Sequence, residues 1–354
     1  MKSLGNFPDP FIAEIAGQPD AVRRAEAAAI ERSDLLAQAA AAARRGRIVL
    51  SGMGSSYDAC YPASTYLAAE GIAAPMHDAA ELLHFRLAAL AAGDVLILVS
   101  QSGESAETVG VARALRERPA PAPTIITVTN GTRNTLARHA DVALDTDTGE
   151  ETGPSTMTFV AALTVMAALA RAIADGSGAP LDAAEADRTA DAIARVVQDA
   201  ELPDRLVGWL GQPRSTVILG RGAARAASEM GALTVKEAVG MPVEALQTAQ
   251  FRHGPLELAG PGLAAIVIAT EPATAELDRA LAEELARLGS AVWFVTAGGA
   301  APPGIPTTDV GPLDRLLAPA AAIVPVQLLA WRLSILAGRP PGSYVHATKV
   351  TTRE

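Results

Sequence analysis

Short apolar runs that end at a glycine or a hydroxyl residue alternate with helical patterns along this chain. The first half has four such runs, at 47–51, 94–100, 124–129 and 141–144. A run this rich in Val, Ile and Leu is typical of a strand that is buried on both faces. Its alternation with helices predicts a parallel sheet covered by helices on both sides, which is the α/β class.

The second half of the chain repeats this plan. Residues 215–220 lead into a Gly-Arg-Gly turn as 47–51 lead into Gly-Met-Gly, and the run 264–274 resembles 94–105. An internal duplication follows, with two tandem domains that are each a three-layer αβα, flavodoxin-like sandwich around a parallel sheet. We predict an N-terminal helical segment, two such domains separated near the Gly- and Pro-containing residues 175–180, and a tail that closes the active site, with bounds of 1–46, 47–178, 182–340 and 341–354.

Composition excludes several classes of protein. The net charge of −10 is the reverse of what a nucleic-acid-binding surface needs. Cys60 is the single cysteine, so neither an intramolecular disulfide nor a thiolate metal cage can form. The N-terminus lacks the apolar core of a signal peptide, and Pro319 and Pro325 interrupt the apolar stretch 316–326. We expect a cytoplasmic protein with no metal, no cofactor and no membrane partner.

The segment Ser100-Gln101-Ser102-Gly103-Glu104-Ser105 follows a predicted strand and precedes a predicted helix. Three hydroxyls, a glycine and a helix N-terminus then meet at the carboxyl edge of a parallel sheet, where such sheets bind ligands. Helix capping accounts for one of the three serines. Hydroxyls and backbone amides bind phosphate without a lysine, so the segment predicts a phosphate site.

The turn at 52–56, Gly-Met-Gly-Ser-Ser, has the same position after the first strand. It is either a tight turn with an N-cap serine or a second wall of the anion site. A dinucleotide-binding turn fits less well, because Tyr57 stands at the third glycine of GxGxxG, although Asp78 could serve as its acidic residue. A Walker A loop is excluded because no Gly-Lys-Ser/Thr follows. The candidate binding residues here are Gly54, Ser55 and Ser56.

Three further segments carry polar side chains of interest. Residues 149–156 contain Glu151 and Ser155 before an apolar helix and form either a capped loop or a third wall of the pocket. Glu237, next to Lys236 on a helix, and His253 in an Arg-His-Gly-Pro loop are ordinary structural residues by themselves, but together they supply a carboxylate base and an imidazole. The tail contains Lys349, and taken alone it reads as a frayed terminus.

In this order the five segments resemble the SIS (sugar isomerase) family, and above all the isomerase half of glucosamine-6-phosphate synthases. The resemblance spans nearly the whole chain. It implies a homodimer with a shared active site, in which His253 assists ring opening in the neighbouring subunit's pocket. It implies that Glu237 transfers a proton between C1 and C2 of the sugar. It also implies that Lys349 lies near the anomeric centre and that Ser155 contacts a sugar hydroxyl. The residues that would bind the phosphate are Ser55, Ser56, Ser100, Gln101, Ser102 and Ser105.

Three departures from that family pattern shape the expected function. The chain starts without a glutaminase domain and its catalytic cysteine, so we expect no ammonia production from glutamine. Met230 and Thr234 stand where the synthases have a glutamate and a lysine, which favours a stand-alone amino-sugar-phosphate deaminase or isomerase over a full aminotransferase. The alternative is a non-catalytic phosphosugar sensor. Residues 1–46 contain no basic helix-turn-helix of the kind found in transcriptional sensors.

Overall fold

The computed structural model describes residues 9–119, 121–176 and 183–353. Contacts divide the chain into two compact units, which we treat separately. The first-half unit contains residues 20–151, 157–187 and 346–354. The second-half unit contains the described residues 9–19, 152–156 and 188–345. The predicted linker at 175–180 lies largely outside the described residues.

The first-half unit is built on a five-stranded parallel sheet of order β2-β1-β3-β4-β5. This is the flavodoxin-like order, in which the chain reverses its direction of travel between β1 and β3. Four strands lie where the apolar runs predicted them, whereas β2 is a three-residue edge strand without an apolar run. The strands are β1 (Ile48–Gly52), β2 (Met76–Asp78), β3 (Val95–Ser100), β4 (Thr124–Thr129) and β5 (Val142–Asp145).

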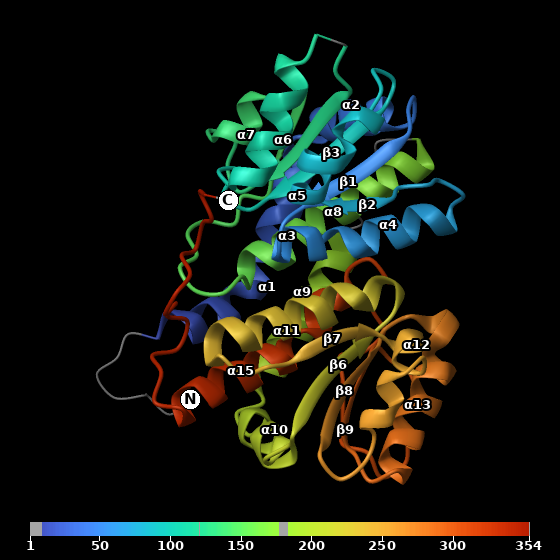
Figure 1. The fold of residues 1–354 in the computed structure, drawn as a ribbon, viewed down its shortest axis with the longest axis vertical. Helices are drawn as coiled ribbons and strands as arrows, with labels where there is room; N and C mark the ends of the chain where they lie inside the picture. Colours follow the sequence, from blue (N-terminus) through green and yellow to red (C-terminus); the bar gives the residue numbers. More distant parts are fainter. Residues whose placement is uncertain (1–8, 120, 177–182, 354) are drawn as a thin grey trace. The chain divides into compact units, whose positions relative to one another are not determined.

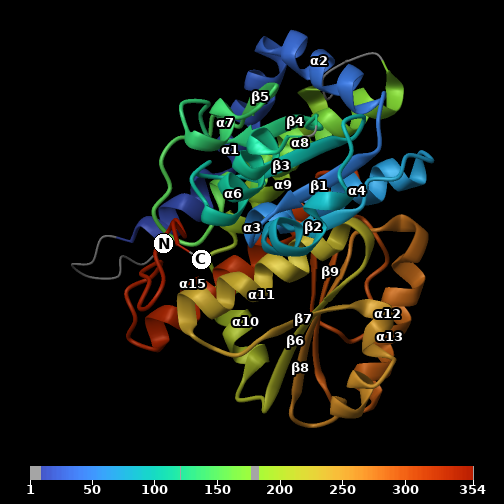
Figure 2. The ribbon, with the colours of Figure 1, turned by 45° about the horizontal axis from the view of Figure 1, so that its top comes forward.

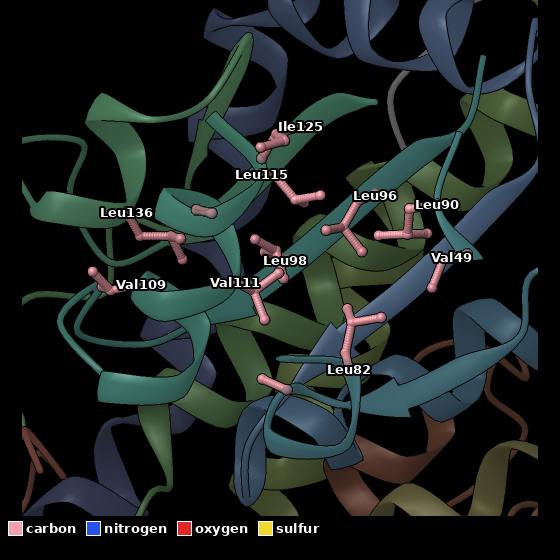
Figure 3. Packing of buried hydrophobic residues seen from close by; sticks show 12 residues of the cluster. Val49, Leu82, Leu90, Leu96, Leu98, Val109, Val111, Leu115, Ile125 and Leu136 are labelled. Carbon is pink, nitrogen blue, oxygen red and sulfur yellow. The ribbon is translucent and has the colours of Figure 1, made fainter. Parts of the chain in front are cut away.

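Helices cover both faces of this sheet (Figure 1). One face packs against α5 (Ala79–Glu81), the π-helix Leu82–Arg86, the 3-10 turn Leu87–Ala89, α6 (Ala106–Glu117) and α7 (Thr135–Arg138). Their apolar side chains form one cluster with strand residues such as Leu96, Leu98 and Ile125 (Figure 3). The other face packs against α2 (Ser33–Ala43), α3 (Ser55–Asp58), α4 (Cys60–Ala69) and α8 (Met157–Asp175).

The N-terminal helical segment differs from its prediction in detail. Residues 19–45, which are rich in Ala, Arg and Glu, predict a single leading helix, but α1 (Pro10–Glu31) begins earlier and a break at Arg32 separates it from α2. Pro19 lies inside α1, so this proline does not mark the start of the helix. The sequence pattern does not predict the first turns of α1, because two closely spaced prolines, Pro8 and Pro10, are typical of a loop.

The second-half unit repeats the architecture with a sheet of order β10-β9-β8-β6-β7, which is the same topology read from the other edge. Figure 2 shows α12 and α13 beside this sheet. Its core joins Val217, Leu219, Val267, Leu285 and Phe294. The strands are β6 (Ser215–Gly220), β7 (Glu244–Gln247), β8 (Leu263–Ala269), β9 (Ala291–Thr296) and β10 (Thr307–Asp309).

Helices form one layer on each face of this sheet (Figure 1). The edge strands β7 and β10 were not predicted, because neither has an apolar run. The helices are α9 (Ala183–Gln198, shared between the units), α10 (Leu202–Leu210), α11 (Arg225–Val239), α12 (Thr248–Phe251), α13 (Ala275–Arg287), α14 (Ala318–Ala322) and α15 (Val324–Leu336), with 3-10 turns at Gly222–Ala224, Pro255–Leu258 and Pro272–Thr274. The predicted α/β fold with two tandem parallel-sheet domains is therefore confirmed.

Among the described residues, two helical stretches are long and apolar enough to cross a membrane: α8 and the pair α14–α15. In α8, 83% of the tested window is buried inside the fold, and in Ala318–Leu336 the share is 78%. A helix that is apolar all round and enclosed by protein is a core helix. The apolar stretch at 316–326 is thus part of a longer buried segment, in which Pro319 and Pro325 lie in the first turns of α14 and α15.

Candidate active site

The turn after β1 approaches the sheet closely. A Cβ on Gly52 would lie 2.9 Å from backbone atoms of Ser56 and Tyr57, so only glycine fits there. Gly54 has a φ of 51° and precedes the first residue of α3. The hydroxyl of Ser56 is nearly buried and accepts a hydrogen bond from the backbone N–H of Gln101 at 3.2 Å. This bond ties the turn after β1 to the segment after β3.

The segment after β3 gathers its hydroxyls at the start of α6. Ser100 Oγ and Ser105 Oγ are hydrogen-bonded at 3.3 Å, and Ser100 Oγ also accepts from the N–H of Gly103 at 3.2 Å. Ser102 Oγ accepts from the N–H of Glu104 at 3.1 Å. Ser105 is the N-cap residue of α6, yet its side chain makes no capping bond. Capping therefore does not explain the serines of this segment.

A small cavity lies at this edge of the sheet, within the first-half unit. Ser55, Ser56 and Gln101, which the sequence analysis named as candidate binding residues, line it. Further lining comes from residues that sequence reasoning missed: Thr129, Asn130, Thr146, Thr158 and Phe159. Their positions in the sequence could have identified three of them, because Thr129, Asn130 and Thr146 lie at the carboxyl ends of β4 and β5. Carboxyl ends of neighbouring parallel strands meet at one edge.

Glu151 lies in a buried polar cluster at the start of α8. Its side chain is fully enclosed, and its carboxylate accepts hydrogen bonds from the N–H and the hydroxyl of Thr158. Lys349 Nζ lies 2.6 Å from Glu151 Oε2. The carboxylate thus caps the N-terminus of α8 and holds a lysine of the C-terminal tail at the same time.

The tail has a second attachment on the same unit. The carbonyl of Thr351 accepts a hydrogen bond from the N–H of Ala106, the first residue of α6, at 3.0 Å. The tail therefore runs from the start of α6 to the Glu151 cluster rather than fraying. It brings Lys349 into the unit that contains the serine segments.

The remaining predicted residues belong to the second-half unit. Glu237 is half-buried on α11, whereas Lys236 is exposed, and His253 is exposed just after α12. Ser155 is half-buried in the segment 152–156 of the same unit. The structure thus gathers the serine segments, Glu151 and Lys349 in one unit and places Glu237, His253 and Ser155 in the other.

The two positions that depart from the synthase pattern are enclosed by protein. Met230 and Thr234 are both fully buried on α11, and the hydroxyl of Thr234 donates to the carbonyl of Met230 at 2.8 Å. Glu229, next to Met230, is paired with Arg225 at 2.7 Å. Neither departure leaves an ionisable side chain at its own position.

Cys60 lies buried at the start of α4. Burial raises the pKa of the Cys60 thiol, which keeps it protonated and unreactive. Within the described ranges, no three His, Cys, Asp or Glu side chains are grouped as a metal site would require. The predicted site residues offer hydroxyls, backbone amides, carboxylates, an imidazole and a lysine.

Comparison with curated proteins gives relatives over most of the chain. A glutamine–fructose-6-phosphate aminotransferase (isomerizing) of Gluconobacter oxydans is 31% identical over 308 residues, which cover 82% of this chain and 49% of that protein. The protein of the same name from Pyrobaculum aerophilum is 30% identical over 365 residues, covering 100% of this chain and 59% of that one. The chain spans about half the length of these relatives.

Solved structures share the complete fold. Tagatose-6-phosphate ketose/aldose isomerase from Escherichia coli has a TM-score of 0.81 at 20% identity, covering 97% of this chain and 98% of its own. Glucosamine-6-phosphate deaminase from Thermotoga maritima has a TM-score of 0.75 at 22% identity, covering 97% and 99%. At these identities the likeness is evidence of fold.

A protein-family model shows which family this chain belongs to. The SIS domain matches residues 42–172 and 210–302, which contain the whole first sheet and strands β6 to β9 of the second. The predicted resemblance is confirmed by this match and by the curated relatives. The chain belongs to the SIS domain family.

Proposed function

We propose that this protein isomerises a hexose or amino-hexose 6-phosphate by moving a proton between C1 and C2, in the manner of a glucosamine-6-phosphate deaminase/isomerase. The observation that carries the proposal is the pair of hydroxyls of Ser100 and Ser105, whose oxygens are 3.3 Å apart at the start of the twelve-residue helix α6. Ser105 is the N-cap residue of this helix, but its hydroxyl makes no capping hydrogen bond. Two hydroxyls and helix amides directed at one point suit a phosphate dianion.

The phosphate group would anchor the substrate at a distance from the reacting carbons. Ser55, Ser56, Ser102 and Gln101 lie beside the hydroxyl pair or line the cavity next to it. Binding energy from a remote group of this kind positions C1 and C2 for chemistry. Ser155 would then contact a sugar hydroxyl.

The proton transfer would be carried by Glu237. His253 assists ring opening, and Lys349 stands near the anomeric carbon. Glu237 removes the proton from C2 of the open-chain aldose and returns it at C1, so that the carbonyl or imine moves to C2. For an amino sugar the C2 imine takes up water and releases ammonia, which leaves fructose 6-phosphate. No oxidant or cofactor is needed in this sequence.

We also propose a homodimer in the cytoplasm, with His253 completing the site of the partner subunit. The exposure of His253 after α12 supports this arrangement, because the imidazole is available to a second copy. The strong negative charge of the chain argues against a nucleic-acid partner.

A non-catalytic phosphosugar sensor is the competing function, and Met230 and Thr234 favour it. One experiment separates the two: purified protein is incubated with glucosamine 6-phosphate, and both fructose 6-phosphate and ammonia are measured. Formation of both in equal amounts supports the deaminase. Thermal stabilisation by the sugar phosphate without turnover supports the sensor. Fructose 6-phosphate and tagatose 6-phosphate, tested in the same assay, cover plain ketose–aldose isomerisation.

A further inference from the structure

The duplication gives the turn after β1 and the segment after β3 counterparts in the second half. β1 ends at Gly52 and β6 at Gly220, and two residues later Gly54 and Gly222 have φ values of 51° and 57°. Ala223 is therefore the counterpart of Ser55. Strand register then extends the correspondence to the next segment.

Ser51 is paired with Leu98 in the first sheet, and its counterpart Leu219 is paired with Val267 in the second. Counting onward from these pairs makes Glu271 the counterpart of Ser102. The N-cap residues of the following helices, Ser105 and Thr274, also coincide.

The second half places a carboxylate at its own switch point between strands. Glu271 Oε1 accepts a hydrogen bond from the backbone N–H of Ala223 at 2.8 Å. A Cβ on Gly222 would lie 3.0 Å from the Cδ of Glu271, so the carboxylate fills the space beside that glycine. The side chain thus spans from the segment after β8 to the turn after β6.

This carboxylate is enclosed and has a cation. Glu271 is 5% exposed, and its Oε2 lies 3.1 Å from a guanidinium nitrogen of Arg315. Arg221, the other arginine at this edge, is already paired with Asp278 at 2.7 Å. Arg315 Nε has no hydrogen-bond partner among the described residues, so this guanidinium has a donor that the carboxylate does not use.

We propose that the second half contains an oxyanion site whose permanent occupant is the chain's own Glu271. The carboxylate occupies the place that the sugar phosphate takes in the first half, a comparison that rests on the proposed function. The site itself stands on the contacts of Ala223, Gly222 and Arg315. The second switch point is then closed to ligands, and emptying it creates a pocket for inorganic phosphate or sulfate.

Chemical rescue tests this proposal in the full-length chain. Glu271→Ala is made in a Ser100→Ala/Ser102→Ala background, so that the first-half site contributes little. Glu276→Ala, an exposed carboxylate at the start of α13, is the matched control. We expect Glu271→Ala to lower the Tm by about 3–8 °C, because a buried N–H and a guanidinium lose their partner. Inorganic phosphate should restore at least half of that loss, whereas chloride at equal ionic strength should not.

The proposal is overturned if phosphate raises the Tm of Glu271→Ala, of Glu276→Ala and of the parent by the same amount. Should Glu271→Ala fail to fold, Glu271→Gln replaces it, since glutamine keeps the shape and the acceptor for Ala223. An unchanged Tm for Glu271→Gln would equally overturn the proposal. A lower Tm supports it, and phosphate should not restore this loss, because the glutamine side chain still occupies the site. Failure of the proposed function appears separately, as absence of sugar-phosphate binding in the unsubstituted protein.

Discussion

Lys349 Nζ lies 2.6 Å from Glu151 Oε2, although 198 positions separate the two residues in the sequence. The carboxylate is fully enclosed and also accepts two hydrogen bonds from Thr158. Glu151 is therefore the residue that fixes the tail lysine on the first-half unit.

Glu151→Gln should weaken this attachment. The substitution removes the charge opposite Lys349, and we expect a loss of about 1–3 kcal/mol in the free energy of unfolding. Turnover should fall by about 10-fold or more, and trypsin should cut after Lys349 faster than in the parent. The exposed neighbour Glu150 provides the control Glu150→Gln. Equal trypsin rates for the two variants would contradict the assignment.

Removing the hydroxyls of the serine segment should weaken phosphosugar binding. Each hydroxyl that donates to a charged phosphate contributes about 1.5–3 kcal/mol, so Ser100→Ala or Ser105→Ala should raise the Kd by about 10- to 100-fold. Calorimetric titration with glucosamine 6-phosphate measures this effect, and exposed Ser33→Ala is the control. A Kd that stays within 2-fold of the parent in both variants would argue against the proposed phosphate site.

Glu237→Gln should separate catalysis from binding. Glutamine has the same shape but cannot take up the proton at C2, so kcat should fall by about 100-fold or more while the Kd for the sugar phosphate stays near that of the parent. Lys236→Gln, at the exposed neighbouring position, should retain activity. Full activity of Glu237→Gln would mean that another group is the base.

Gly103 should not tolerate a side chain. Its φ is 63°, and an added Cβ would lie 2.1 Å from the side chain of Asn134, which caps α7. Gly103→Ala should cost about 1–3 kcal/mol of stability, measured by urea denaturation, and it should also weaken sugar-phosphate binding. Gly93→Ala is the control, because a Cβ there meets no atom within 4 Å. A similar stability for the two variants would show that the segment adjusts freely.

The Arg47–Asp94 pair should make stability depend on pH in acid. The guanidinium of Arg47, 2.7 Å from Asp94 Oδ2, holds the pKa of the Asp94 carboxyl below its ordinary value. The folded chain thus binds this proton less readily, so the pair stabilises at neutral pH, and its contribution disappears as the pH falls from about 5 through the ordinary value near 4 and below.

Asp94→Asn should therefore lower the Tm at pH 7, with a gap to the parent that narrows as the pH falls below about 4. Because Arg47 is half exposed, solvent screens the pair and its contribution to stability is small. Thermal unfolding followed between pH 7 and pH 3 measures the gap, and exposed Glu117→Gln is the control. A gap that is constant over this range would contradict the assigned role of Arg47.

The sequence by itself determined the fold class, the duplication and the central strands. The runs that became β1, β3, β4, β6, β8 and β9 are apolar enough that only a buried strand suits them. Glycines and serines at fixed offsets after those runs marked the switch-point edge. These signals are local, since each depends on residues close together in the chain.

The tertiary structure decided what depends on distant residues. The edge strands β2, β7 and β10 lack apolar runs and exist because a neighbouring strand pairs with them. The attachment of Lys349 to Glu151 and of Glu271 to Ala223 likewise could not be deduced, because which charge meets which is set by chain packing. Burial then makes such contacts matter, since an enclosed polar group costs free energy unless it has a partner.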